Sequence, residues 1–316
     1  MAGARAHEPI PRRPLGRHRD VEVCIMGLGG YHLGTIGSRR EAVRIVQAAV
    51  DEGIAFMDNA WEYHDGESEK IMGEALAAGG RRDQVFLMTK VCTHGRDKKV
   101  ALRQLAESLR RLRTDHLDLW QVHEVVYEND PDLHFAEGGV LEALDEAKRQ
   151  GKVRFVGFTG HKDPLLHLKM LERGFPFDTC QLPLNCFDAR FRSFEQHVLP
   201  ELLRRGVAPL GMKSITGDGA PARKRAVKAT DALRYAMSLP VATTISGIDS
   251  MKVLRQNLSV ARGFQPMSKE EMESLRRRTE PVAADGRFEL YKTTAKHDGP
   301  VGRAQHGFPP QEAQEA

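Results

Sequence analysis

The sequence predicts a (β/α)8 TIM barrel, a single α/β domain in which eight parallel strands alternate with helices. Short apolar runs alternate about eight times with longer segments whose apolar residues recur at helical spacing. The apolar runs lack inside–outside alternation, as expected for strands that are buried on both faces. The connections between units are short, and no linker divides the 316 residues. These three observations favour one barrel domain.

The first unit illustrates how the element boundaries are assigned. Residues 21–26 form an apolar strand that ends at the glycine-rich stretch 27–30. Ser38, followed three residues later by Glu41, is a capping box that begins a helix, and Gly53 ends that helix. The remaining strands are expected at 54–57, 85–89, 117–122, 153–158, 179–184, 207–212 and 241–245, and the remaining helices at 67–78, 98–112, 140–149, 164–173, 194–205, 224–237, 251–261 and 269–279.

Three parts of the chain are expected. Residues 1–20, rich in Pro and Arg, form an extended N-terminal segment, residues 21–280 form the barrel, and residues 281–316 form an irregular C-terminal tail. A doubly wound sheet is the alternative fold. It requires a G-x-G-x-x-G turn after the first strand and an acidic residue in the ribose-binding role, and the sequence completes neither.

Composition excludes several classes of function. The hydrophobic content of 41% and charged content of 28% are typical of a globular protein, and the net charge of +4 is spread over mixed-sign helices. No nucleic-acid partner is therefore expected. No apolar run approaches the roughly 20 residues of a membrane span, so no membrane association is expected either. Four scattered cysteines without a C-x-x-C motif indicate reduced thiols and a cytoplasmic protein without a structural metal.

Polar side chains stand at three successive strand ends, where a barrel places its active site. Asp58 follows the second strand, Lys90 the third and His123 the fourth, and Tyr63 lies in the loop after Asp58. Each residue alone has an ordinary structural explanation, but together they form a proton-donating site. We expect Lys90 to lower the pKa of Tyr63, Asp58 to orient Lys90, and His123 to donate to a substrate oxygen. A hydride for carbonyl reduction must then come from a cofactor.

These motifs resemble the aldo-keto reductase family, from about Leu15 to Ala261. The resemblance rests on the glycine-rich stretch 27–30, the Asp58–Glu69 loop, the segments ending at Lys90 and His123, and residues 156–158. It implies a (β/α)8 barrel that binds a nicotinamide cofactor without a Rossmann domain, and an enzyme that interconverts carbonyl compounds and alcohols. The implied catalytic tetrad is Asp58, Tyr63, Lys90 and His123, with Tyr63 as the general acid.

The cofactor site implied by the resemblance departs from the family pattern in places. The family's Ser-Asn pair is replaced by Thr159 and Gly160, the aromatic residue that stacks on nicotinamide by Met212, and the Arg that binds a 2′-phosphate by Val253. NADP(H) is the expected cofactor, with NAD(H) as the alternative. The expected cofactor-binding residues are Gly29, Thr159, Gln181, Met212, Lys213, Gly247 and Asn257.

Two other functions fit parts of the sequence. A non-catalytic, nucleotide-binding regulatory subunit on the same barrel would explain the altered cofactor residues, but not the intact tetrad. A metal-dependent hydrolase would use His32, His94, His123 and His161, whose spacing lacks the close pairing of a metal motif. The sequence therefore favours a reductase whose partner is a small carbonyl or alcohol substrate.

Overall fold

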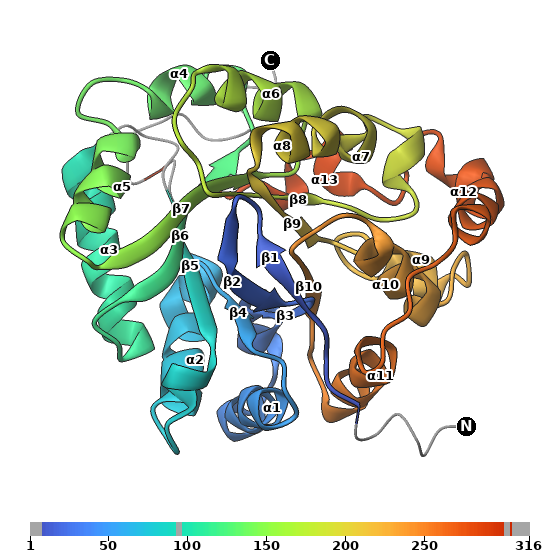
Figure 1. Ribbon diagram of the computed structural model, residues 1–316, viewed down its shortest axis with the longest axis horizontal. Coiled ribbons are helices and arrows are strands. Elements are labelled where there is room, and N and C mark those ends of the chain that lie inside the picture. The colour runs from blue at the N-terminus through green and yellow to red at the C-terminus, as the bar shows by residue number, and fades with distance from the viewer. Residues whose placement is uncertain (1–7, 93–96, 300–303, 305–316) are drawn as a thin grey trace.

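A computed structural model of the chain describes residues 8–92, 97–299 and 304. Its centre is a closed barrel of parallel strands surrounded by helices (Figure 1). The strands pair in the order β10-β3-β4-β5-β6-β7-β8-β9, which confirms the expected (β/α)8 barrel. The barrel strands are β3 (Met26–Gly29), β4 (Phe56–Asp58), β5 (Phe86–Cys92), β6 (Leu117–Val125), β7 (Val153–Gly160), β8 (Thr179–Pro183), β9 (Ala208–Met212) and β10 (Thr243–Gly247).

Helices follow the strands and bury their apolar faces against the barrel, and most of them match the predicted ranges. The longer helices are α1 (Arg39–Asp51), α2 (Glu67–Leu76), α3 (Lys98–Leu112), α5 (Val140–Arg149), α6 (Pro164–Glu172), α8 (Leu199–Arg205), α10 (Ala229–Ser238), α11 (Met251–Ala261) and α12 (Lys269–Ala283). The short ones are α4 (Asp130–His134), α7 (Phe194–His197), α9 (Ala220–Arg223) and α13 (Leu290–Thr293). Single 3-10 turns lie at η2 (Gly30–Thr35), η3 (Tyr63–Gly66), η4 (Arg81–Gln84), η5 (Asp188–Arg190) and η6 (Ala295–His297).

The N-terminal region forms a β-hairpin that the sequence did not predict. Strand β1 (Arg12–Leu15) pairs antiparallel with β2 (His18–Cys24), and the predicted first barrel strand at 21–26 is mostly β2. The Arg13 guanidinium donates to the carbonyls of Met237, Leu239 and Val241 at the end of α10. The hairpin is thus tied to the last part of the barrel rather than extending freely.

The first barrel strand is instead the glycine-rich β3, which was predicted to be a turn. Glycine suits this position because the barrel is narrow. A Cβ atom at Gly27 would lie 2.9 Å from the Phe56 ring of β4, and one at Gly30, just after the strand, would lie 2.7 Å from the Asp58 carbonyl oxygen. The missing side chains therefore let β3 approach its neighbour closely.

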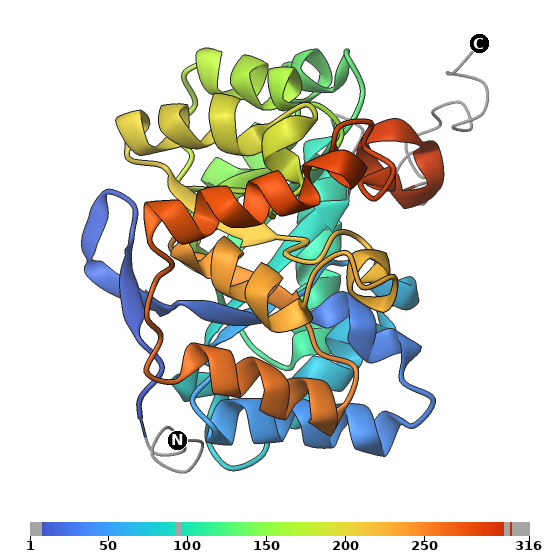
Figure 2. The same ribbon diagram turned by 90° about the vertical axis from the view of Figure 1, so that its right-hand side faces the viewer.

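The C-terminal segment contains more helix than the expected irregular tail. Helix α12 continues through Pro281 to Ala283, and α13 and η6 follow it. Figures 1 and 2 together show the hairpin at one end of the barrel and α13 at the opposite end. That opposite end is where the carboxyl ends of the strands open, so the C-terminal segment lies beside the expected active site.

Among the described residues, no helix has the length and apolar character needed to cross a membrane.

Candidate active site

Three strand ends bring the predicted catalytic residues together. The Lys90 ammonium, on β5, donates to Asp58 Oδ1 at 2.6 Å and to the Asn59 carbonyl oxygen at 2.7 Å. The Tyr63 hydroxyl lies 3.4 Å from the same ammonium. Lys90 and Asp58 are buried, so this ion pair is held in a place that water reaches poorly. The lysine therefore has one fixed position, directed at the phenol.

The loop that carries Tyr63 is held by an arginine from α3. Arg111 donates to the Trp61 carbonyl oxygen at 2.9 Å and to the buried Glu69 carboxylate at 3.1 Å. Gly66 ends the loop with φ 82°, and a Cβ atom there would lie 2.3 Å from the Arg111 guanidinium carbon. Only glycine fits both this backbone conformation and the space beside the guanidinium. The loop geometry thus fixes Tyr63 before any substrate arrives.

The electrostatic environment of Tyr63 differs from the expectation. Burial, followed by the carboxylates of Asp58, Glu62 and Glu124, raises the pKa of Tyr63 well above its ordinary value. The expected net lowering of this pKa is therefore wrong, because burial and the three carboxylates outweigh any lowering by the Lys90 ammonium. The phenol is therefore held in its protonated form, the form that can give a proton.

His123, at the end of β6, stands against Tyr63 with carboxylates beside both of its ring nitrogens. The Tyr63 and His123 ring centroids are 5.7 Å apart at an interplanar angle of 83°. His123 Nδ1 lies 2.6 Å from Glu62 Oε1, and Nε2 lies 3.7 Å from Glu124 Oε2. Burial acts to raise the pKa of Glu62, but the adjacent His123 outweighs it, so the net pKa is lowered and Glu62 is an anion.

Sequence reasoning missed both carboxylates, Glu62 and Glu124. Neighbouring residues of a regular strand point to opposite faces, so strand periodicity alone gives no reason to place Glu124 beside His123. The pairing of β6 with β7 is irregular between Val122 and Val125, and this irregularity lets both side chains reach the same cluster. Glu62 directly precedes Tyr63 in the sequence, and this adjacency was the one sequence feature that could have indicated a carboxylate beside the phenol.

The C-terminal segment closes this cluster from outside. The Gly299 amide donates to Glu124 Oε1 at 2.6 Å, and a Cβ atom on Gly299 would lie 2.8 Å from Glu62 Oε2. His161 Nδ1 lies 3.1 Å from Glu124 Oε2, and its Nε2 lies 3.3 Å from Asp298 Oδ1. The tail that the sequence treated as irregular is therefore part of the site.

A second cluster anchors the same segment deeper in the protein. Lys292 is fully buried, and its ammonium lies 2.7 Å from Asp188 Oδ1 and 3.0 Å from Glu289 Oε1. The Tyr291 hydroxyl donates to Glu289 at 2.6 Å, and Asn185 donates to that hydroxyl at 3.1 Å. The segment is thus fixed at two points, one at each end.

The expected nicotinamide contacts lie on adjacent strands. Thr159 of β7 pairs with Gln181 of β8, and both are buried. The Gln181 amide nitrogen lies 3.8 Å from the Met212 sulfur, and its Oε1 atom has no hydrogen-bond partner in the described part of the chain. A buried amide oxygen without a partner is costly unless a ligand completes it. These residues fit a bound carboxamide group, which would supply the missing donor.

The remaining expected cofactor residues line the junction of β3 and β10. Gly29 and Gly247 pair across the two strands, and a Cβ atom on Gly247 would lie 2.3 Å from the His32 ring. Asn257, buried on α11, donates to Ser246 Oγ at 3.0 Å. The His32 ring occupies the place that a side chain at residue 247 would take, and Asn257 holds the end of β10 through Ser246.

Lys213 follows β9 in a left-handed conformation with φ 55°. Its ammonium lies 5.1 Å from the centroid of the Tyr291 ring, and its carbonyl oxygen accepts from Asn185 at 3.2 Å. Burial lowers the pKa of Lys213, although the charges of Glu124 and Asp298 act against this shift. The lysine therefore stands between the expected cofactor groove and the C-terminal segment.

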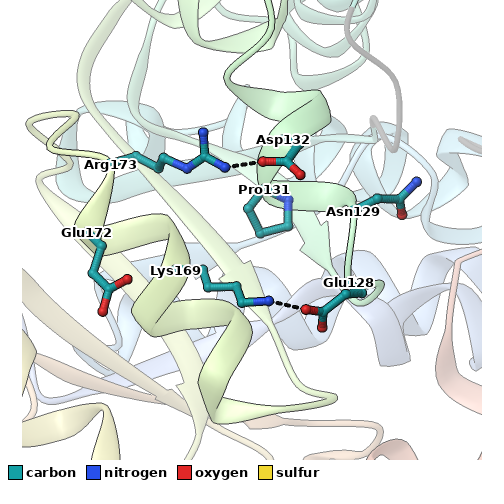
Figure 3. Close-up of a pocket in the computed structure, with 7 residues that line it drawn as sticks. All are labelled: Glu128, Asn129, Pro131, Asp132, Lys169, Glu172 and Arg173. Carbon is teal, nitrogen blue, oxygen red and sulfur yellow. Dashed lines mark hydrogen bonds and ion pairs between the residues drawn. The ribbon is translucent and has the colours of Figure 1, made fainter.

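A separate hollow of about 550 Å³ lies on the outer surface (Figure 3). It is bordered by α4 and α6, where Lys169 pairs with Glu128 and Arg173 pairs with Asp132. None of its lining residues belongs to the cluster around Tyr63. The hollow is therefore distinct from the candidate active site.

The predicted alternative of a histidine metal site gains no support from the part of the chain that the structure describes. His94 lies outside the described residues. Among the others, no group of three or more His, Cys, Asp or Glu side chains is placed to hold a metal ion. His123 and His161 instead contact carboxylates, as described above.

Comparison with known proteins connects this geometry to a family. Residues 25–231 match the model of the "Aldo/keto reductase family". The chain is 30% identical to aldo-keto reductase YhdN of Bacillus subtilis over 192 residues, 57% of this chain and 55% of that protein. It is 26% identical to the uncharacterized oxidoreductase YqkF of B. subtilis over 308 residues, 85% of this chain and 96% of that protein.

Solved structures of other proteins share this barrel fold. The aldo-keto reductase AKR11C1 from Bacillus halodurans, in its holo form, superposes with a TM-score of 0.69 at 24% identity, over 86% of this chain and 96% of that one. An aldo/keto reductase from Klebsiella pneumoniae in complex with NADP and acetate superposes with a TM-score of 0.66 at 23% identity, over 85% and 94%. From the family match, which covers more than half of its length, the chain belongs to the aldo/keto reductase family, as its sequence predicted.

Proposed function

We propose that the chain is an NAD(P)H-dependent carbonyl reductase in which Tyr63 donates the proton. The observation that carries this proposal is the position of the Lys90 ammonium, 2.6 Å from Asp58 and 3.4 Å from the Tyr63 hydroxyl. His123 lies against the same phenol, with ring centroids 5.7 Å apart. Membership of the aldo/keto reductase family, whose members reduce carbonyl groups, supports it.

In this proposal each side chain has a defined task. The substrate carbonyl oxygen accepts hydrogen bonds from Tyr63 and His123, which polarise the C=O bond. A reduced nicotinamide held by Thr159, Gln181 and Met212 would supply the hydride that the carbonyl carbon takes up. Tyr63 releases its proton to the oxygen as the C=O π bond breaks, and Lys90 stabilises the phenolate that remains. Asp58 holds the Lys90 ammonium in position beside the phenol.

The residues present fit a nicotinamide cofactor. Among the described residues, the buried Gln181 Oε1 atom has no hydrogen-bond partner, and Gly247 lies at the end of β10 against the His32 ring. Thr159, Gln181 and Met212 would hold the nicotinamide, and Gly29, Lys213, Gly247 and Asn257 would border the rest. NADP(H) is the proposed cofactor, as in the K. pneumoniae relative, with NAD(H) as the alternative.

Two features bear on the choice of cofactor. Val253 offers no charge for a 2′-phosphate, and Asp249 is exposed beside the same helix start. Titration with NADPH and NADH, followed by cofactor fluorescence, measures the preference. Binding of neither cofactor would contradict the reductase assignment, and tighter binding of NADH would assign NAD(H) instead.

The test of the mechanism is Tyr63→Phe, which removes only the hydroxyl. We expect carbonyl reduction to fall by about 10²–10⁴-fold, the usual contribution of a general acid, with cofactor binding nearly unchanged. Tyr31→Phe is the matched control, because Tyr31 is exposed and contacts Tyr63 only through its ring. Equal turnover by Tyr63→Phe and the parent enzyme would disprove the role given to Tyr63.

The alternative of a non-catalytic, nucleotide-binding regulatory subunit has no specific observation in its favour. The altered cofactor residues remain compatible with binding, and the contacts of Lys90 with Asp58 and Tyr63 support catalysis instead. A reducing compartment such as the cytoplasm is proposed as the location. All four cysteines lie in the described part of the chain, are buried, and form no disulfide there.

A further inference from the structure

The backbone that follows Tyr63 is left-handed over three consecutive residues. His64 has φ 50° and ψ 49°, Asp65 has φ 54° and ψ 35°, and Gly66 has φ 82° and ψ 5°. Glycine adopts this conformation freely, whereas residues with a Cβ atom adopt it uncommonly. Such a run persists only where contacts with the rest of the protein hold it. Arg111 accounts for Gly66, as described above, and the two residues before it need contacts of their own.

His64 makes such contacts with the turn that follows β3. Its Nε2 atom lies 2.9 Å from the Tyr31 carbonyl oxygen in η2. A carbonyl oxygen can only accept a hydrogen bond, so the Nε2 atom carries a hydrogen and donates it. The His64 ring also lies directly on the backbone of Gly34, where any Cβ atom would overlap the ring. One side chain thus holds η3, in the second barrel unit, against η2, in the first.

Both turns carry residues of the proposed site. Turn η3 begins at Tyr63, whose ring stands edge-on to the Tyr31 ring, with centroids 5.3 Å apart and an interplanar angle of 88°. In η2, the His32 ring lies against Gly247 at the end of β10. This end of β10 is proposed above to border the cofactor. The contacts of His64 therefore hold the proton donor in a fixed place relative to the cofactor side of the barrel.

We propose that His64 is a positioning residue, which sets the location of Tyr63 relative to the cofactor side of the site by holding η3 against η2. It acts through Tyr63 and takes no part in proton transfer itself. The proposal rests on the reductase function proposed above, and it adds a residue that lies outside the tetrad.

The other contacts of the Tyr63 loop do not replace this one. Asp58 and Lys90 come from β4 and β5, and Arg111 comes from α3, so these residues tie the loop to the second and third barrel units. Among the described residues, His64 supplies the side-chain hydrogen bond between η3 and the first unit. Without it the two turns can shift against each other, and a misplacement of about 1 Å can lower a catalytic rate by about 10²-fold.

His64→Gly tests the proposal, because it removes the ring and leaves a residue that adopts the left-handed conformation without strain. We expect kcat for carbonyl reduction to fall about ten- to hundredfold, because the proton donor is no longer held in place. The Kd of the nicotinamide cofactor should stay within about twofold of the parent value, since His64 is not one of the proposed cofactor contacts. A residue needed only for folding would not separate these two quantities.

Asp65→Gly is the matched control, because Asp65 has the same left-handed backbone and its side chain is exposed. It makes the same kind of backbone change one residue later, and it should leave kcat within about twofold of the parent value. Amide hydrogen exchange of the protein without cofactor gives a readout that does not depend on activity. Residues 60–66 should exchange faster in His64→Gly than in the parent or in Asp65→Gly.

The outcomes separate this proposal from the proposed function. Equal kcat in His64→Gly and the parent, or equal losses in His64→Gly and Asp65→Gly, would overturn the role of His64 while leaving the reductase function intact. Unchanged hydrogen exchange in His64→Gly would overturn that role whether or not the parent is active. A parent protein that reduces no carbonyl compound would refute the reductase function itself.

Discussion

Lys292 offers a test of what holds the C-terminal segment against the barrel. Its ammonium is fully buried and contacts Asp188 Oδ1 at 2.7 Å, Glu289 Oε1 at 3.0 Å and the Phe191 carbonyl oxygen at 2.7 Å. Lys292→Met keeps the length of the side chain but removes the charge. Two carboxylates then share an interior site without a cation, and leaving a buried charge uncompensated costs about 3–5 kcal/mol.

The loss of stability in Lys292→Met is large enough to measure. With an unfolding entropy of ~2.1 cal/mol/K per residue over 316 residues, this loss lowers the melting temperature by roughly 5–8 °C. Urea unfolding followed by tryptophan fluorescence gives the free energy of unfolding directly. The matched control is Lys70→Met, which removes an exposed lysine paired with Glu67 at 3.4 Å and should cost under about 1 kcal/mol.

The loss should also depend on pH. Burial raises the pKa of Glu289 in the folded protein, so its protonated form is favoured there. Without Lys292 this pKa rises further. A carboxyl group whose pKa is raised in the folded protein adds stability at low pH, and this stability is lost as the pH rises through the raised pKa. The destabilisation caused by Lys292→Met should therefore be smaller near pH 5 than near pH 8. A loss below about 1 kcal/mol at both pH values would refute the reasoning.

Two further predictions concern the proposed chemistry. Because the pKa of Tyr63 is raised, its phenol stays protonated through the neutral range, and kcat/KM for carbonyl reduction should show no fall from phenol ionisation below about pH 10. A pH–rate profile checks this, and a descending limb with a midpoint near pH 7 that Tyr63→Phe abolishes would contradict it. Gln181→Leu should raise the KM for the nicotinamide cofactor about five- to tenfold through one lost hydrogen bond, whereas Gln150→Leu on the exposed end of α5 should not change it.

The sequence predicted the barrel because its strands are apolar runs that no other element type explains. Helices α3, α5 and α11 span the predicted ranges, and the side chains of Asp97 and Ser250 cap the first and the last of them. The proposed catalytic residues were identified for a related reason, since polar residues such as Lys90 and His123 stand at successive strand ends. Features that are set by residues close together in the sequence were therefore predictable.

Features that depend on distant partners were not predictable. The hairpin of β1 and β2 is stabilised by contacts more than two hundred residues away, such as Arg13 to Met237. The direction of the Glu124 side chain depends on irregular strand pairing. The raised pKa of Tyr63 depends first on burial and then on the carboxylates of Asp58, Glu62 and Glu124. The Gly- and Pro-rich composition of the tail predicted an irregular segment and did not indicate that the Gly299 amide would contact Glu124.

The N-terminal hairpin has a consequence for how the protein is made. Arg13 leaves the ribosome early, yet its acceptor carbonyls at Met237, Leu239 and Val241 are synthesised 224 to 228 residues later. At about 5–20 residues per second, the guanidinium must wait roughly 11–45 s for its partners. Nascent chains that stop before Val241 cannot complete this contact. The hairpin therefore gains its full set of anchors only after most of the barrel strands have been made, so its protection from proteases reports synthesis through Val241.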